Sequence, residues 1–285
     1  MVGTGAMGLG VVRALLGKGF TVRAHDIVAA RQAMAVELGA VGCASAAEAA
    51  RSSSVVITLV VDATQTRDAL FGKGGVREGL MAGAVVMMCS TIAPADAESI
   101  AAELAGTPML DAPISGGPAR AHAGTLSVMA AGSEPAFAAC EAVLAAMSAK
   151  CFRVSMRPGD GSRMKVVNNM LAAANLAAGC EAMALAEKLG LDAKQVRDVV
   201  NASSGGSWIF TDRMARALEG DFTPHAAARV LTKDVGLFTD VARSLGLETP
   251  MADCAREIFL DTVRRGYAEE DDAAVLKRYR DLYEN

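Results

Sequence analysis

The amino-acid sequence predicts an α/β fold in which a mostly parallel sheet domain is followed by an all-helical domain. In the first half, short apolar runs alternate with segments of helical periodicity, which is typical of a parallel sheet covered by helices. After about residue 155 only helical patterns follow, and the change falls near Pro158. We therefore expect a first domain at residues 1–157 and a second at 158–285.

The composition narrows the class of protein. The chain has 285 residues, 52% of them hydrophobic, which suffices for one large domain or two ordinary ones. The net charge of -4, without a basic stripe, argues against nucleic acid as a partner. No apolar run approaches the ~18 residues of a membrane span. The six cysteines lack metal-ligand spacing and only three histidines are present, so we expect no metal site. Reduced cysteines and the lack of a signal peptide predict a cytoplasmic protein.

A glycine-rich loop opens the chain. The stretch Gly3–Gly8 fits the pattern G-x-G-x-x-G, in which glycines let the backbone approach a pyrophosphate. A helix that closes at Gly17 and a strand over Phe20–His25 are expected next, and Asp26 ends that strand where an acid would bind ribose hydroxyls. The unit predicts a Rossmann-type site for NAD rather than NADP, because Asp26 would repel a 2′-phosphate. A plain glycine-rich turn before an ordinary helix is the alternative.

The rest of the first domain continues the alternation. The strand that should precede the glycine loop is truncated, since only Met1 and Val2 are present. Further strands are expected over Val55–Val61 and Ala84–Cys89, and Pro108–Pro113 is extended. Helices are expected over Ala30–Leu38, Ser45–Arg51, Ala63–Phe71 and Pro94–Leu104. Ligands bind at the carboxyl ends of parallel strands, so Val60, Val61, Ser90 and Thr91 are cofactor candidates.

Two further stretches carry polar groups suited to a small acid. Ser115, Gly116 and Gly117 expose backbone N–H groups and a hydroxyl, which suit a carboxylate; a plain turn is the alternative. Lys165 and Asn169 lie one turn apart near the start of an expected helix over Met164–Leu189. A lysine that loses its water contacts exchanges protons more readily near neutrality, although a lysine that snorkels to water explains the pattern too.

The helix over Met164–Leu189 is apolar on almost every face, which indicates a domain or subunit interface. The expected helices after it cover Ala193–Asn201, Thr211–Leu218, Leu231–Leu245, Met251–Gly266 and Asp271–Tyr283.

Four stretches together resemble the β-hydroxyacid dehydrogenase family, which includes 3-hydroxyisobutyrate dehydrogenase. They are Gly3–Gly8, Asp111–Gly117 with Ala121 and Gly124–Leu126 behind it, Gly159–Asn169, and Lys233–Asp234. The resemblance implies hydride transfer between NAD(P) and a small anionic hydroxy acid. It also implies a Rossmann domain, a helical domain joined to it by a long helix, and a homodimer or homotetramer.

The resemblance also assigns roles to individual residues. Lys165 matches the catalytic acid/base, and Asn169, Ser115, Gly116 and Gly117 match substrate ligands. Thr91 and Lys233 match residues close to the cofactor, although a surface ion pair with Asp234 is the alternative for Lys233. With the residues above, the expected cofactor ligands are Gly3, Gly5, Ala6, Met7, Gly8, Asp26, Val60, Val61, Thr91 and Lys233.

Within the family, three segments resemble the branch that oxidises L-threonate to its 2-oxo acid: Leu59–Gln65, Leu70–Gly72 and Gly206–Phe210. Alternatives within the family are a 3-hydroxyisobutyrate dehydrogenase and a tartronate or succinic semialdehyde reductase. Imine reductases are disfavoured, because they generally lack the lysine that Lys165 supplies. An alternative of another class is a non-catalytic NAD-binding protein on the same scaffold.

Overall fold

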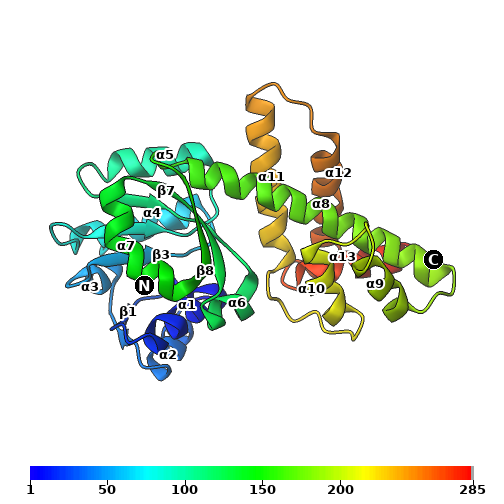
Figure 1. The fold of residues 1–285 in the computed structure, drawn as a ribbon, viewed down its shortest axis with the longest axis horizontal. Helices are drawn as coiled ribbons and strands as arrows, with labels where there is room; N and C mark the ends of the chain where they lie inside the picture. Colours follow the sequence, from blue (N-terminus) through cyan, green and yellow to red (C-terminus); the bar gives the residue numbers. More distant parts are fainter. Residues whose placement is uncertain (284–285) are drawn as a thin grey trace. The chain divides into compact units, whose positions relative to one another are not determined.

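The computed structural model describes residues 1–283, which divide into two compact units (Figure 1). The first unit is Met1–Lys165 and the second begins at Val166. The sequence places the domain boundary at residues 157/158, just before the long helix. In the structure the first turn of that helix belongs to the first unit, because its amino terminus is hydrogen-bonded to the sheet.

The first unit is built on a six-stranded sheet of order β3-β4-β5-β7-β6, with β8 paired to β7, and a small two-stranded sheet of β1 and β2. Strands β3, β4 and β5 are parallel, β7 is antiparallel to both β5 and β6, and β8 is parallel to β7. The mostly parallel sheet that the sequence predicts is therefore confirmed. The strands are β1 (Arg23–Ala24), β2 (Val41–Gly42), β3 (Val55–Thr58), β4 (Val85–Met88), β5 (Met109–Asp111), β6 (Ile114–Ser115), β7 (Leu126–Gly132) and β8 (Ser148–Ser155).

The short segment before the glycine loop joins the two sheets. Val2 donates its N–H to the Ile57 carbonyl oxygen (2.8 Å) and accepts from the Leu59 N–H (2.9 Å). On its other side, Met1 accepts from the His25 N–H at 3.0 Å. Met1 to Gly3 thus occupy the central strand position between β1 and β3, where a doubly wound sheet has its first strand.

Helices cover both faces of the six-stranded sheet, because its central strands are buried on both sides. On β4, Val85 and Met87 enter one apolar core with α1 and α7, whereas Val86 and Met88 enter a second core with α3, α4 and α5. The helices of this unit are α1 (Ala6–Gly17), α2 (Ala29–Glu37), α3 (Ala46–Ala50), α4 (Ala63–Phe71), η1 (Val76–Glu78), α5 (Pro94–Glu103), α6 (Gly117–Ala123) and α7 (Glu134–Met147).

Most predicted elements of this unit are present, with shorter strands. The run Val55–Val61 forms a strand only as far as Thr58, since the next residues turn away towards α4. The Ser45 hydroxyl accepts from the Glu48 N–H and caps the start of the helix predicted over Ser45–Arg51. The strands and helices between residues 118 and 155 have no counterpart among the predicted elements and are a finding of the structure.

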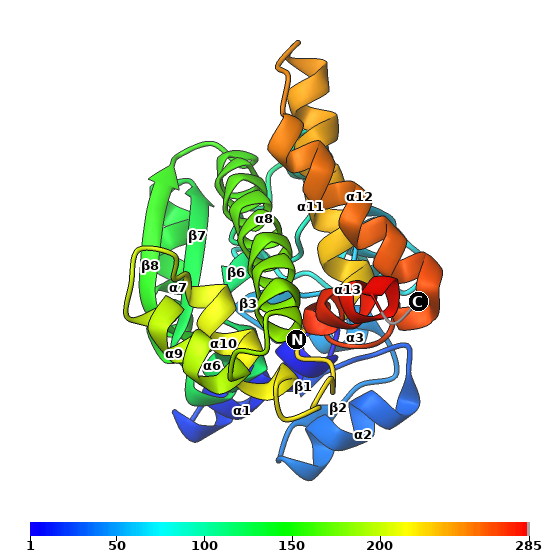
Figure 2. The same ribbon diagram turned by 90° about the vertical axis from the view of Figure 1, so that its right-hand side faces the viewer.

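The second unit is helical and encloses one apolar core. Helix α8 (Asp160–Lys188) runs into it from the first unit. It continues with α9 (Ala193–Asn201), α10 (Trp208–Ala217), α11 (Ala228–Ser244), α12 (Pro250–Thr262), the π-helical η2 (Val263–Tyr267), η3 (Asp272–Ala274) and α13 (Val275–Tyr283). Helices α11 and α12 lie side by side as a hairpin in both views (Figures 1 and 2).

Several helices of the second unit begin at other residues than predicted. Helix α8 begins at Asp160 rather than Met164, and α11 at Ala228 rather than Leu231. Helix α10 begins at Trp208 rather than Thr211, because the Ser207 hydroxyl accepts from the Phe210 N–H and caps it. One face of α8 is exposed in this single chain, and the domain or subunit interface predicted for this helix stays a prediction. Val167, Leu171 and Leu185 on that face are 51–60% exposed.

Among residues 1–283, no helix combines the length and the apolar composition needed to cross a bilayer.

Candidate active site

Two glycines allow the loop after Val2 to fold tightly against β3. Gly3 has a φ of +90°, and a Cβ atom there would lie 2.3 Å from the Leu59 carbonyl oxygen. A Cβ atom on Gly8 would lie 2.1 Å from the Gly3 carbonyl oxygen. A side chain at either position would push the loop away from the sheet, so the loop requires glycine at both.

The open side of the same loop is shaped to receive a ligand. A Cβ atom on Gly5 would meet no protein atom within 4 Å. Gly5 precedes α1, no side chain caps the helix there, and its first turn has no acidic residue. The N–H groups at the start of α1, including those of Ala6 and Met7, therefore present uncompensated partial positive charge. This arrangement fits the pyrophosphate of a dinucleotide.

Asp26 lies at the end of the next strand and holds the glycine loop in place. Its Oδ2 atom accepts from the Thr4 N–H at 2.6 Å and from the Thr4 hydroxyl at 3.3 Å. Its Oδ1 atom accepts from the Val28 N–H at 2.9 Å. A carboxylate can accept about four hydrogen bonds, so little capacity remains for ribose hydroxyls. Ribose binding by Asp26 stays a prediction, and its role in holding the loop is an addition from the structure.

The ends of β3 and β4 are joined beside the loop. The Val60 N–H donates to the hydroxyl of the buried Ser90 at 3.0 Å, and the Val61 N–H donates to Gln65 at 3.3 Å. A Cβ atom on Gly3 would lie 3.0 Å from a Val60 methyl carbon, so Val60 borders the glycine loop. Val60 and Val61 therefore lie two and three residues beyond the end of β3, and Thr91 follows Ser90 directly in the chain.

The Ser-Gly-Gly stretch forms a turn from a strand into a helix. Ser115 ends β6, and Gly117 begins α6. Gly116 and Gly117 have φ values of +132° and +73°, which other residues adopt only with strain. The positive φ values explain why glycine occupies both positions. Carboxylate binding by these residues stays a prediction.

A fully buried carboxylate holds the start of α8, which carries Lys165. Asp111, the last residue of β5, accepts three hydrogen bonds of 2.8 Å: one from the Gly159 N–H, one from the Ser162 N–H and one from the Ser162 hydroxyl. Burial raises the pKa of Asp111, and the bonds from Ser162 and Gly159 oppose that shift. Lys165 lies three residues after Ser162 on α8, and it is only 7% exposed.

In the second unit a buried aspartate contacts two predicted site residues. The Asn169 amide donates to Asp234 Oδ2 at 2.7 Å, and the Lys233 ammonium lies 2.6 Å from Asp234 Oδ1. Asn169 and Asp234 are both buried, whereas Lys233 is partly exposed. The ion pair that the sequence allows for Lys233 is present, but its acidic partner lies in the interior rather than on the surface.

The sequence alone predicts no function for Asp111 or Asp234. In the structure Asp111 holds the start of the helix that carries Lys165, and Asp234 contacts Asn169 and Lys233. The only signal for Asp111 is a charged residue directly after an apolar strand. For Asp234 it is an acid on the buried side of an amphipathic helix.

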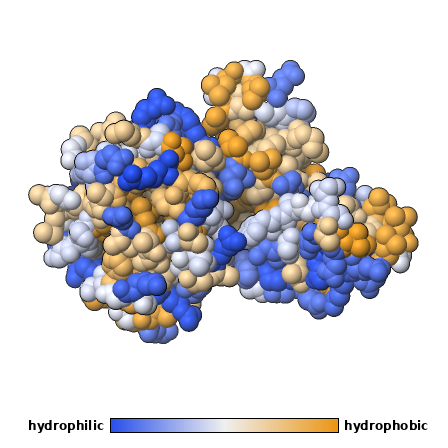
Figure 3. Space-filling model, viewed as in Figure 1, coloured by the Kyte–Doolittle hydropathy of each residue, from blue (hydrophilic) through white to orange (hydrophobic). Residues whose placement is uncertain are grey.

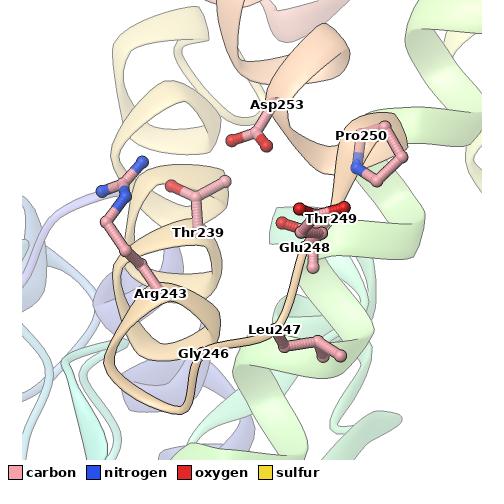
Figure 4. A pocket seen from close by; sticks show the side chains of 8 residues that line it. All are labelled: Thr239, Arg243, Gly246, Leu247, Glu248, Thr249, Pro250 and Asp253. Atoms are coloured by element: carbon pink, nitrogen blue, oxygen red, sulfur yellow. The ribbon is translucent and has the colours of Figure 1, made fainter.

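A pocket at the tip of the α11–α12 hairpin is open to solvent (Figure 4). Exposed apolar side chains gather at the same tip, as Figure 3 shows, and include Leu245, Leu247 and Met251. The pocket is lined by Thr239, Arg243, Gly246, Leu247, Glu248, Thr249, Pro250 and Asp253. None of the predicted site residues lines it, so it is separate from the chemistry described above.

No metal site is formed by the part of the chain that the structure describes, since no group of three His, Cys, Asp or Glu residues is placed to hold an ion. The six cysteines are free thiols, and Cys89 and Cys180 are among the buried ones.

Comparisons with known proteins agree with the fold and the loop. Residues 1–155 match the family model described as the NAD binding domain of 6-phosphogluconate dehydrogenase. Residues 159–279 match the model described as the NAD-binding domain of NADP-dependent 3-hydroxyisobutyrate dehydrogenase.

Individual relatives cover almost the whole chain. L-threonate dehydrogenase from Escherichia coli K12 is 41% identical over 97% of this chain and 93% of its own length. The corresponding enzyme from Cupriavidus necator is 40% identical over 97% of this chain and 94% of its own length. The crystal structure of a 3-hydroxyisobutyrate dehydrogenase from Salmonella typhimurium superposes with a TM-score of 0.91 at 41% identity, covering 97% of this chain and 98% of that one.

The fold and the glycine loop thus define an NAD(P)-dependent dehydrogenase with a Rossmann domain and a helical domain. The chain belongs to the 3-hydroxyisobutyrate dehydrogenase family of β-hydroxyacid dehydrogenases.

Proposed function

We propose that this enzyme oxidises L-threonate to its 2-oxo acid with NAD, and that Lys165 is the acid/base. The observation that carries the catalytic role is the lysine itself: it is buried at the start of α8, and Asn169 follows one turn later on the same helix. The substrate is inferred from the relatives named L-threonate dehydrogenase, which are 40–41% identical to this chain.

Oxidation of an alcohol removes a hydride from carbon and a proton from oxygen. The bound nicotinamide supplies the hydride acceptor. Lys165, as the neutral amine, takes the proton from the substrate hydroxyl and becomes an ammonium. In the reverse direction the ammonium stabilises the charge that develops on the oxygen and then returns the proton.

The remaining residues bind the acid and the cofactor. Ser115, Gly116 and Gly117 offer a hydroxyl and backbone N–H groups to the substrate carboxylate. The Asn169 side chain keeps one N–H for a substrate hydroxyl, because its other N–H donates to Asp234 and its oxygen accepts from the Asn168 amide at 3.0 Å. The positive charge of Lys233 favours an anionic substrate and cofactor. The residues proposed to hold the cofactor are those of the loop Gly3–Gly8 together with Asp26, Val60, Val61, Thr91 and Lys233.

Asp26 is proposed to favour NAD over NADP. Replacement by asparagine removes the charge, keeps an oxygen for the Thr4 N–H and gives up only the bond from the Val28 N–H, so the contact that holds the glycine loop is retained. In Asp26→Asn the ratio of kcat/KM for NAD to that for NADP is expected to fall about tenfold, which corresponds to about 1.4 kcal/mol of charge repulsion. Initial rates with both cofactors measure it. An unchanged ratio would show that Asp26 only holds the loop.

We further propose a homodimer or homotetramer that works in the cytoplasm. The exposed apolar residues of α8, Val167, Leu171 and Leu185, support an interface with another copy, since large apolar side chains exposed along one helix face are typical of interaction surfaces. The six free thiols support a reducing compartment.

The test of the substrate is a panel of acids with NAD, followed at the nicotinamide absorbance. We expect L-threonate to give the highest kcat/KM among L-threonate, D-erythronate, D-glycerate and 3-hydroxyisobutyrate. Tartronate and succinic semialdehydes, tested with NADH, cover the reductase alternatives. Preference for another acid would replace L-threonate but retain the proposed role of Lys165. Failure of every compound would overturn the substrate assignment.

A further inference from the structure

The amino terminus of α8 is capped from a distant strand rather than by its own residues. Asp111 lies 48 residues before Gly159 and 51 before Ser162, and it accepts all three of its hydrogen bonds from these two residues. Asp111 is fully buried and Ser162 nearly so. The carboxylate therefore satisfies backbone N–H groups at the positive end of the helix, where a negative charge is most favourable.

Close packing leaves this helix end little room to move. A Cβ atom on Gly161 would lie 2.4 Å from the Asp111 carbonyl oxygen and 2.6 Å from that of Met129, so the helix backbone lies directly on strands β5 and β7. On the solvent side, Asp160 accepts from the Ser155 hydroxyl at 2.6 Å, and Arg163 forms an ion pair with Glu98. The first turn is thus held from both sides.

Lys165 is less than one helical turn beyond Ser162. Because a helix is rigid over such a distance, the position of its first turn determines where the Cα atom of Lys165 lies. A misplacement of about 1 Å at a reacting group can lower a rate by about 100-fold. The residues that hold the first turn of α8 therefore also determine which positions the Lys165 amine can occupy.

We propose that Asp111 is a positioning residue for the reaction: by capping α8 it places the Lys165 amine for proton transfer. The inference rests on the proposed role of Lys165. It assigns to Asp111 a contribution to kcat that acts through Lys165 and leaves cofactor binding unchanged.

The first experiment measures kcat, KM and the dissociation constant of NADH for Asp111→Ala, Asp111→Asn and Ser162→Ala in the full-length enzyme. We expect Asp111→Ala to lower kcat about 100-fold with NADH affinity unchanged. Asp111→Asn should retain most of kcat, because the amide oxygen accepts both N–H bonds and the Ser162 hydroxyl can accept from the amide. Ser162→Ala loses only the hydroxyl bond and should show a smaller loss than Asp111→Ala. If Asp111→Ala does not fold, Ser162→Ala carries the test.

The second experiment separates positioning from general damage. In Lys165→Ala, methylamine replaces the missing amine from solution and is expected to restore part of the turnover. A free amine does not depend on where α8 begins, so Asp111→Ala should change the methylamine-dependent rate of Lys165→Ala by less than about twofold. An equal loss in both backgrounds would overturn the inference, since Asp111 would then act on something other than the lysine.

Asp192→Ala is the matched control, because Asp192 caps α9 by accepting from the Gln195 N–H at 2.7 Å. It should lower the melting temperature without changing kcat. The outcomes also separate the two proposals. Full activity of Lys165→Ala would overturn the proposed function, whereas loss in Lys165→Ala with normal kcat in Asp111→Ala and Ser162→Ala would overturn only the role of Asp111.

Discussion

Lys165→Ala is expected to lower kcat by about 10²–10⁴-fold, the range that a positioned acid/base contributes. The loss should fall on kcat because proton transfer belongs to the chemical step. Binding of NADH should be unchanged, since the glycine loop and the start of α1 are separate from Lys165 in the chain. Steady-state rates and a fluorescence titration with NADH measure the two quantities.

Two variants make this expectation specific. Lys165→Arg keeps the positive charge but cannot give up its proton at neutral pH, so it should be nearly as slow as alanine. Lys188→Ala removes a lysine from the other end of the same helix, where its ammonium donates to the Tyr283 carbonyl oxygen, and should leave kcat unchanged. A kcat within a few-fold of the parent in Lys165→Ala would exclude the lysine as acid/base.

Arg213→Ala is expected to cause the largest loss of stability, about 3–5 kcal/mol. Arg213 is buried in the second unit, where its Nε atom donates to Asp272 at 2.5 Å and lies 3.4 Å from Asp271. Asp271 also accepts from the Arg216 guanidinium and from the His225 N–H, both at 2.8 Å. The network joins α10 to the segments before α11 and α13. Removing the arginine leaves buried carboxylate charge without its partner.

The loss should depend on pH. Burial raises the pKa of Asp272 from 3.8 to about 7, even with Arg213 opposing the shift. Between these values the folded chain holds a proton that the unfolded chain has released, so this group lowers the free energy of unfolding as the pH rises. Without Arg213 the carboxylate holds its proton more tightly. We therefore expect Arg213→Ala to be less destabilising at pH 5 than at pH 8.

Urea unfolding followed by tryptophan fluorescence measures both effects, because the single tryptophan, Trp208, lies in α10, the helix that carries Arg213. Arg243→Ala is the control. Arg243 forms an exposed ion pair with Asp240 and should change the free energy of unfolding by less than about 1 kcal/mol. Equal losses in the two variants would mean that the buried network adds no stability.

Much of the first unit can be predicted from the sequence because its signals are local. The unbroken apolar run of β4 predicts a strand buried on both faces, and its side chains do enter two cores. The spacing of Gly3, Gly5 and Gly8 predicts a tight loop. A Cβ atom on Gly3 or Gly8 would collide with a backbone oxygen, whereas one on Gly5 would face open space. The elements of residues 118–155 have no predicted counterpart, and one of them, β8, is a partly exposed edge strand without alternation.

The sequence by itself determined the α/β order of elements, the glycine loop at the start of α1, and the placement of Lys165 and Asn169 one turn apart on α8. These features depend on residues close together in the chain, where periodicity and turn chemistry leave a readable pattern. Only the tertiary structure decided which carboxylates hold them: Asp26 on the glycine loop, Asp111 on α8, and Asp234 on Asn169. Those contacts join residues 22 to 65 positions apart, and a hydrogen bond over such a separation depends on the packing of whole elements rather than on any local pattern.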